Sequence, residues 1–301
     1  MYLPLGETAA LITAACYTAS STFFTRAGQQ FGSWVTNRAR LLVAVILLAA
    51  MHWIFLGQPL PLDAAPERWL WLGASGIVGL VLGDLFLFQA YIWIGPRLGL
   101  LLLSLAPVLA AGLAWLFLGE VLSLLDGLGM AATLGGIAWV VLEGRGRGES
   151  QPRKVNYLSG LLAGFLAAAG QAGGLVLAKK GLGGDFSALS ANVMRMSVAL
   201  LALWTLTLLQ GQIPETLRRL RARPTGLKFI LAGSVIGPLA GVSLSLYAIQ
   251  HTTVGIASTL IALPPVFFLP VAYFVFKERF SWGTVAGTLL ALAGVAVLFL
   301  F

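Results

Sequence analysis

Two charged residues stand inside long apolar stretches of the sequence. Asp84 lies in "LVLGDLFLF" and Arg195 lies in "NVMRMSVAL". A charge at the centre of a bilayer costs about 2.5–3.5 kcal/mol on insertion scales, so such a residue is expected to form an ion pair or to serve a function. We therefore name both as candidate coupling or gating residues. The structural alternatives are a salt bridge from Asp84 to Arg97 at a helix end, and snorkelling of Arg195 and Arg40 to the headgroups.

Neutral polar residues recur at matching places and could line a substrate cavity. Tyr17 in "AACYTASST" and Gln171 in "AAAGQAGG" stand 154 positions apart, each among small residues. Prolines free backbone carbonyls one turn earlier, and these can meet water or an ammonium group. Each serine could instead bond to its own backbone. The expected lining of a central cavity is Tyr17, Gln171, Ser104, Pro107, Ser243, Tyr247, Ala262 and Pro265.

Motifs for enzymatic or cofactor chemistry are weak. The stretch "GGLVLAKKG" has its glycines and lysines in the wrong order for a phosphate-binding loop, and His52 and His251 lack zinc-site spacing. Cys16 is the only cysteine, so no cysteine-based metal site is expected. An intramembrane aspartyl protease remains the alternative from another class, although Leu82 stands where G-x-G-D needs glycine. We expect a protein without metal or cofactor that is not an enzyme.

The elements that must position these residues are membrane-spanning helices. Hydrophobic residues make up 58% of the chain and charged residues only 10%, far from the composition of a soluble domain. A span needs about 20 apolar residues. The sequence predicts an all-α integral membrane protein with ten spans, at residues 6–26, 33–56, 68–92, 97–118, 121–143, 157–178, 186–210, 226–249, 254–276 and 280–301.

The basic residues indicate orientation in the membrane. The net charge is +8, and 15 of the 19 Lys and Arg fall in loops on one face of the predicted bundle. Cytoplasmic loops carry an excess of Lys and Arg, so both termini are predicted to be extracytoplasmic. The clustering in loops also argues against nucleic acid as a partner. The expected partners are the lipid bilayer and a small-molecule substrate.

The second half of the chain repeats the first. At an offset of 158 positions, Pro107 matches Pro265 and Glu120 matches Glu278, and a nearby register aligns "NRARLLVA" with "NVMRMSVA". We predict a first five-helix repeat at residues 1–143, a linker at 144–156 and a second repeat at 157–301. Five spans per repeat make the second copy inverted, which places a substrate site at the interface. The two glutamates are expected to serve as structural turns, and the two prolines as helix kinks or bending points.

Together these features resemble the EamA-type branch of the drug/metabolite transporter superfamily. The resemblance rests on the ten spans, the duplication, and "APVLAAGLAWLFLGE" matched by "PPVFFLPVAYFVFKE". It implies a monomeric bacterial inner-membrane transporter that exports small metabolites, above all neutral and aromatic amino acids, by alternating access. A lipophilic drug or other-metabolite pump is the alternative. Many family members are expected to keep both termini in the cytoplasm, opposite to the charge-based prediction.

Overall fold

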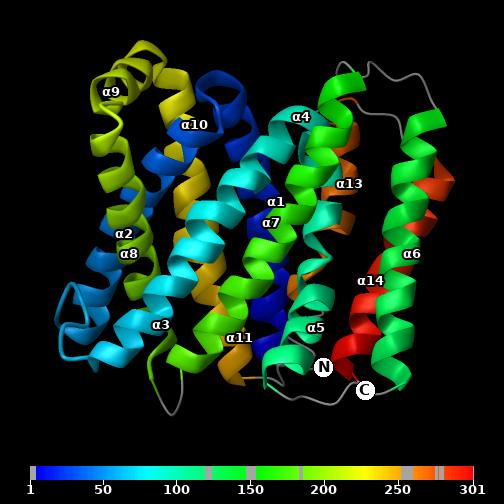
Figure 1. Cartoon of the computed structure of the whole chain (residues 1–301), viewed down its shortest axis with the longest axis horizontal. Coiled ribbons are helices and arrows are strands. Elements are labelled where there is room, and N and C mark those ends of the chain that lie inside the picture. Colours follow the sequence, from blue (N-terminus) through cyan, green and yellow to red (C-terminus); the bar gives the residue numbers. More distant parts are fainter. Residues whose placement is uncertain are drawn as a thin grey trace.

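The protein is a bundle of helices. The computed structural model describes residues 5–118, 124–146, 154–182, 186–251, 260–274, 277 and 281–300, and within these ranges it contains no strand. The predicted all-α fold is therefore confirmed, and Figure 1 shows the long helices packed side by side. The elements are α1 Leu5–Phe31, α2 Ser33–Leu56, α3 Pro66–Gly76, η1 Ile77–Gly83, α4 Asp84–Leu103, α5 Ala106–Leu118, α6 Leu124–Gly146, α7 Lys154–Gly181, α8 Ala188–Leu209, α9 Ile213–Ala222, α10 Pro224–Ser234, η2 Val235–Gly241, α11 Val242–His251, α13 Pro264–Phe274 and α14 Trp282–Leu300.

Several of these helices have the length and composition of membrane spans. In the described part of the chain, five stretches are long and apolar enough to cross a bilayer, and shorter apolar helices accompany them. The chain is therefore a multi-pass membrane protein. The five stretches are Ser33–Leu56, Pro66–Leu103, Tyr157–Ala178, Ala188–Leu209 and Pro224–Ser245.

Among the residues that the structure describes, each half contains one π-helical segment, and the two segments match in sequence position. The element η1 covers Ile77–Gly83 and η2 covers Val235–Gly241, each with 7 residues, so they begin 158 positions apart. π-Helices are rare and occur mostly as short insertions, frequently at functional positions. Their recurrence at this offset means that the two halves share a local structure as well as a composition.

The two π-helical segments pack against the opposite half of the chain. Gly83, at the end of η1, lies against Gln171 of α7, and Gly241, at the end of η2, lies against Tyr17 of α1. Glycine permits this approach, because a Cβ atom at Gly241 would lie only 2.9 Å from the Tyr17 ring. The first helix of each half, α1 or α7, thus packs against the π-helical segment of the other half. Tyr17 and Gln171 make the equivalent contacts.

The helices α6 and α14 cross at equivalent residues. Thr133 and Ala291 are 158 positions apart, and the Thr133 hydroxyl donates to the Ala291 carbonyl at 3.3 Å. Gly136 packs so closely that a Cβ atom there would lie 2.5 Å from the Gly287 carbonyl oxygen. A contact between equivalent residues lies on the axis that relates the two halves. Figure 1 agrees with an inverted pair, since α1 and α7, the first helices of the two halves, start at opposite ends of the bundle.

Short breaks interrupt the helices: the first lies in the predicted loop at 93–96, and the next two lie inside the predicted spans 97–118 and 254–276. Gly95 has a positive φ of 79° and breaks α4 before Pro96. A second break, at 104–105, separates α4 from α5, and an equivalent break at 262–263 precedes α13. Pro107 and Pro265 are therefore the second residues of helices, where proline is tolerated, and each follows a break that lies inside a predicted span. Bending at these positions stays a prediction.

Candidate substrate site between the two halves

A buried ion pair occupies the middle of the first half. Arg40 Nη2 lies 2.5 Å from Asp84 Oδ2, with side-chain exposures of 6% and 9%. Arg40 also donates to Asn37 Oδ1 at 3.1 Å. Two expected alternatives are wrong here: the ion pair of Asp84 is with Arg40 rather than Arg97, and Arg40 does not reach the headgroups. Pairing explains how both charges are tolerated inside the bundle.

Two amide side chains join this ion pair to the π-helical segment η1. Asn37 Nδ2 donates to the Leu80 carbonyl at 3.0 Å. Gln171 Nε2 donates to Asp84 Oδ1 at 2.8 Å and to the Gly79 carbonyl at 3.2 Å. Since Gln171 belongs to α7, the second half of the chain contributes directly to the charged centre of the first.

Aromatic rings cover Arg40. Its guanidinium carbon lies 5.9 Å from the centroid of Phe24 and 5.4 Å from that of Phe88, and the two rings are 5.2 Å apart. A desolvated cation–π contact is worth about 2 kcal/mol. Phe24 comes from α1 and Phe88 from α4, so the rings shield the ion pair and link α1 to it.

Arg195 of α8 approaches the same centre. Its Nη2 atom would lie 3.6 Å from a Cβ atom built at Gly79, and Asp84 and Tyr17 are within electrostatic range of it. The Nε atom is buried and has no hydrogen-bond partner among the described residues, yet the side chain as a whole stays partly exposed. The two candidate gating residues, Asp84 and Arg195, therefore belong to one cluster of charges. Their coupling role stays a prediction.

Tyr17 reaches this cluster from α1. Its side chain interacts with that of Ser245 on α11 and lies within electrostatic range of Arg195. The structure thus brings four of the predicted site residues together, Tyr17 and Gln171 with Asp84 and Arg195. Ser245, which is buried, was not among the predicted lining residues.

Ser243 and Tyr247 lie elsewhere on α11. The Ser243 hydroxyl donates to the Leu239 carbonyl and lies 3.7 Å from the sulfur of Met51 on α2. Tyr247 is 38% exposed. These contacts of Ser243 are with α11 itself and with α2, and substrate binding by Ser243 and Tyr247 stays a prediction.

The remaining predicted lining residues stand at the two equivalent helix breaks. The Ser104 hydroxyl bonds back to the Leu100 carbonyl at 3.3 Å, the alternative expected for a serine in a span. The Thr18 hydroxyl lies 3.4 Å from the Pro264 carbonyl, so the second break is beside α1 and close to Tyr17. The four residues at the breaks are Ser104, Pro107, Ala262 and Pro265.

Sequence reasoning missed Arg40 and Asn37 as members of the site. Asn37 appeared only through the register that aligns "NRARLLVA" with "NVMRMSVA", and Arg40 appeared there and as a residue expected to snorkel. A signal was available, because an Asn and an Arg spaced three apart recur in both halves and share a helix face. The buried acid Asp84 also requires a base, and the repeated arginine could have been proposed for it.

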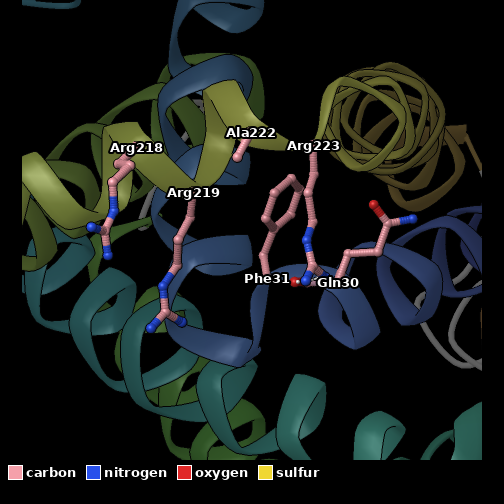
Figure 2. A pocket seen from close by; sticks show the side chains of 6 residues that line it. All are labelled: Gln30, Phe31, Arg218, Arg219, Ala222 and Arg223. Atoms are coloured by element: carbon pink, nitrogen blue, oxygen red, sulfur yellow. Dashed lines mark hydrogen bonds between the residues drawn. The ribbon is translucent and has the colours of Figure 1, made fainter.

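A basic hollow lies at the α9 end of the bundle. It measures about 440 Å³ and is lined by Gln30, Phe31, Arg218, Arg219, Ala222 and Arg223. Figure 2 shows Arg223 beside the Phe31 ring, and its Nη1 atom donates to the Gln30 carbonyl at 2.8 Å. A hydrogen bond from Arg219 at 2.7 Å lowers the pKa of the exposed Glu215 carboxyl below its usual value. The hollow therefore presents positive charge at one end of the bundle.

The other candidate residues give no second site. Within the described ranges, no group of three or more His, Cys, Asp and Glu could hold a metal ion. His52 is buried and lies 2.9 Å from the Ser190 hydroxyl, which joins α2 to α8. Glu120 and Glu278 lie outside the described residues.

Comparison with known proteins identifies the fold and the family. A family model described as the EamA-like transporter family matches the chain twice, over residues 4–142 and 158–300. A solved structure described only as "Crystal structure of protein" superposes with a TM-score of 0.62 over 98% of this chain and 96% of that chain, at 16% identity. At this identity the likeness shows the fold alone. No curated protein matches the chain.

Proposed function

The chain belongs to the EamA-like transporter family, whose members are transporters rather than enzymes, and we propose that it exports small metabolites, with neutral and aromatic amino acids as its substrates. The overall layout resembles the bacterial amino-acid exporter YddG. The proposed setting is the bacterial inner membrane, with a single chain as the working unit. In this proposal, residues 1–143 and 157–301 form the two moving halves, joined by residues 144–156.

One observation carries the proposal: a charged cluster lies between the two halves, inside the bundle. Asp84, Arg40 and Gln171 form its bonded part, and Arg195 and Tyr17 border it. Ionisable residues inside spans mark substrate and ion pathways. In transporters built from inverted repeats, the substrate site lies at the repeat interface near the midplane. A zwitterion needs one positive and one negative group at such a site, and this cluster has both.

The same symmetry supports alternating access as the proposed mechanism. The first helix of each half packs against the π-helical segment of the other half. Tyr17 of α1 contacts Gly241 of η2, and Gln171 of α7 contacts Gly83 of η1. Rocking one half against the other would therefore change both of these helix contacts at the same time. We propose that opening of one face closes the other, with the helix breaks at 104–105 and 262–263 as points of bending.

A transport assay tests the proposal. Purified protein is reconstituted in liposomes loaded with a mixture of unlabelled amino acids, and counterflow of labelled L-phenylalanine and L-leucine is measured against protein-free liposomes. We expect accumulation of at least one of the two labels. If neither accumulates while a lipophilic cation such as tetraphenylphosphonium does, the drug-pump alternative replaces the amino-acid proposal.

A further inference from the structure

The Asn and Arg pairs of the two halves differ in how their donors are satisfied. In the first half, Asn37 donates to the carbonyl of Leu80, and Arg40 pairs with Asp84. In the second half, Asn192 Nδ2 and Arg195 Nε are both buried, and neither has a hydrogen-bond partner among the described residues. A buried donor without a partner carries its full desolvation cost. The second pair is therefore incomplete in this structure.

The missing partner is an acid. At the offset of 158 positions, the residue that corresponds to Asp84 is Val242, which supplies no acceptor. Within the cluster, Arg40 and Arg195 carry two positive charges against the single carboxylate of Asp84, and Asp84 is already bonded to Arg40 and Gln171. One positive charge is thus left over, on Arg195.

The side chain that carries this charge keeps some exposed surface. Asn192 and Arg195 are three residues apart on α8 and share one helix face. Asn192 is buried, but Arg195 is partly exposed, and its Nη2 atom lies close to Gly79 of η1, 3.6 Å from where a Cβ atom would stand. The planar guanidinium fork matches the two oxygens of a carboxylate, and an amide N–H beside it can serve as a further donor.

We propose that Arg195, assisted by Asn192, binds the carboxylate group of the substrate, which takes the place that Asp84 takes beside Arg40 in the first half. The inference rests on the proposed function and narrows it: the substrate must carry a carboxylate. The excess charge of the cluster and the two unsatisfied donors are accounted for by one bound anion. A cationic drug gains nothing at this position.

Three small probes separate the carboxylate from the rest of an amino acid. L-Phenylalanine has both charged groups, 3-phenylpropionate has only the carboxylate, and phenethylamine has only the amine. Ligand binding raises the melting temperature of the protein in detergent, so a thermal unfolding series at rising concentrations gives an apparent affinity for each probe. For the unmodified protein we expect stabilisation by both carboxylates and none by phenethylamine.

Variants assign this recognition to Arg195. Arg195→Gln should weaken binding of both carboxylates roughly 30-fold or more, because a buried charge pair loses one partner. Arg195→Lys keeps the charge and should recover part of the affinity. Arg218→Gln makes the same chemical change at an exposed position on α9 and should leave the affinities unchanged.

Each outcome decides between the two proposals. Stabilisation of the unmodified protein by 3-phenylpropionate but not by L-phenylalanine would uphold the carboxylate site and refute amino-acid transport. Equal stabilisation by phenethylamine, no stabilisation by either carboxylate, or full carboxylate affinity in Arg195→Gln would overturn the inference. If Arg195→Gln fails to fold, the probe series on the unmodified protein and on Arg195→Lys still decides.

Discussion

Replacing Gly170 with alanine should separate α7 from the centre of the first half. A Cβ atom at Gly170 would lie 2.7 Å from the Cα atom of Gly83 and 3.1 Å from its amide nitrogen. Non-bonded carbon atoms need about 3.5–4.0 Å, so α7 must move away by roughly 1 Å. Both contacts are to backbone, which cannot rotate aside as a side chain can.

This displacement breaks the bonds made by the neighbouring Gln171. Its 2.8 Å hydrogen bond to Asp84 and its 3.2 Å bond to the Gly79 carbonyl would both stretch beyond hydrogen-bonding distance. Overpacking costs about 1–3 kcal/mol and each interhelical hydrogen bond about 0.6 kcal/mol, so Gly170→Ala should lower the unfolding free energy by about 2–4 kcal/mol. Transport should fall as well, because Asp84 loses a partner from the other half.

The assay is unfolding by sodium dodecyl sulfate in mixed micelles, followed by tryptophan fluorescence. The control is Gly173→Ala on the same helix, where a Cβ atom would meet only one methyl group of Val78 at 3.3 Å. Both variants gain the same helix propensity from alanine, so their difference isolates the close approach. If Gly170→Ala is as stable and as active as Gly173→Ala, the reasoning about the α7 crossing is refuted.

Three further predictions concern the charge cluster, α9 and the topology. Asp84→Asn should lower the unfolding free energy by about 3–5 kcal/mol, since Arg40 stays buried without a counter-charge; equal stability in the same detergent assay would contradict this. Arg38 bonds Thr216 at 2.9 Å and Gln212 at 2.7 Å, so Arg38→Ala should release α9 and speed amide hydrogen exchange across residues 213–222, whereas unchanged exchange would place the anchor elsewhere. In a Cys16→Ala background, Ala222→Cys should be protected from an impermeant maleimide on intact cells and Asp63→Cys should be labelled; the reverse pattern would invert the proposed orientation.

The helical, membrane-spanning and duplicated character of the protein could be read from the sequence. Hydropathy is a property of each residue, so a stretch of 20 apolar residues predicts a helix in lipid whatever surrounds it. The duplication was visible as matched positions at a constant offset, and the two π-helical segments lie at that same offset. The equivalence of Tyr17 and Gln171 was also readable, since they stand 154 positions apart, each among small residues.

The tertiary structure alone decided which charges meet. Asp84 is 13 positions from Arg97 and 44 from Arg40 along the chain, yet the ion pair joins Asp84 to Arg40, because α2 turns that face toward α4. Which acid pairs with which base depends on the helix faces that packing brings together. The sequence could therefore name the charged residues inside the spans, but it could not say which of them was left without a counter-charge.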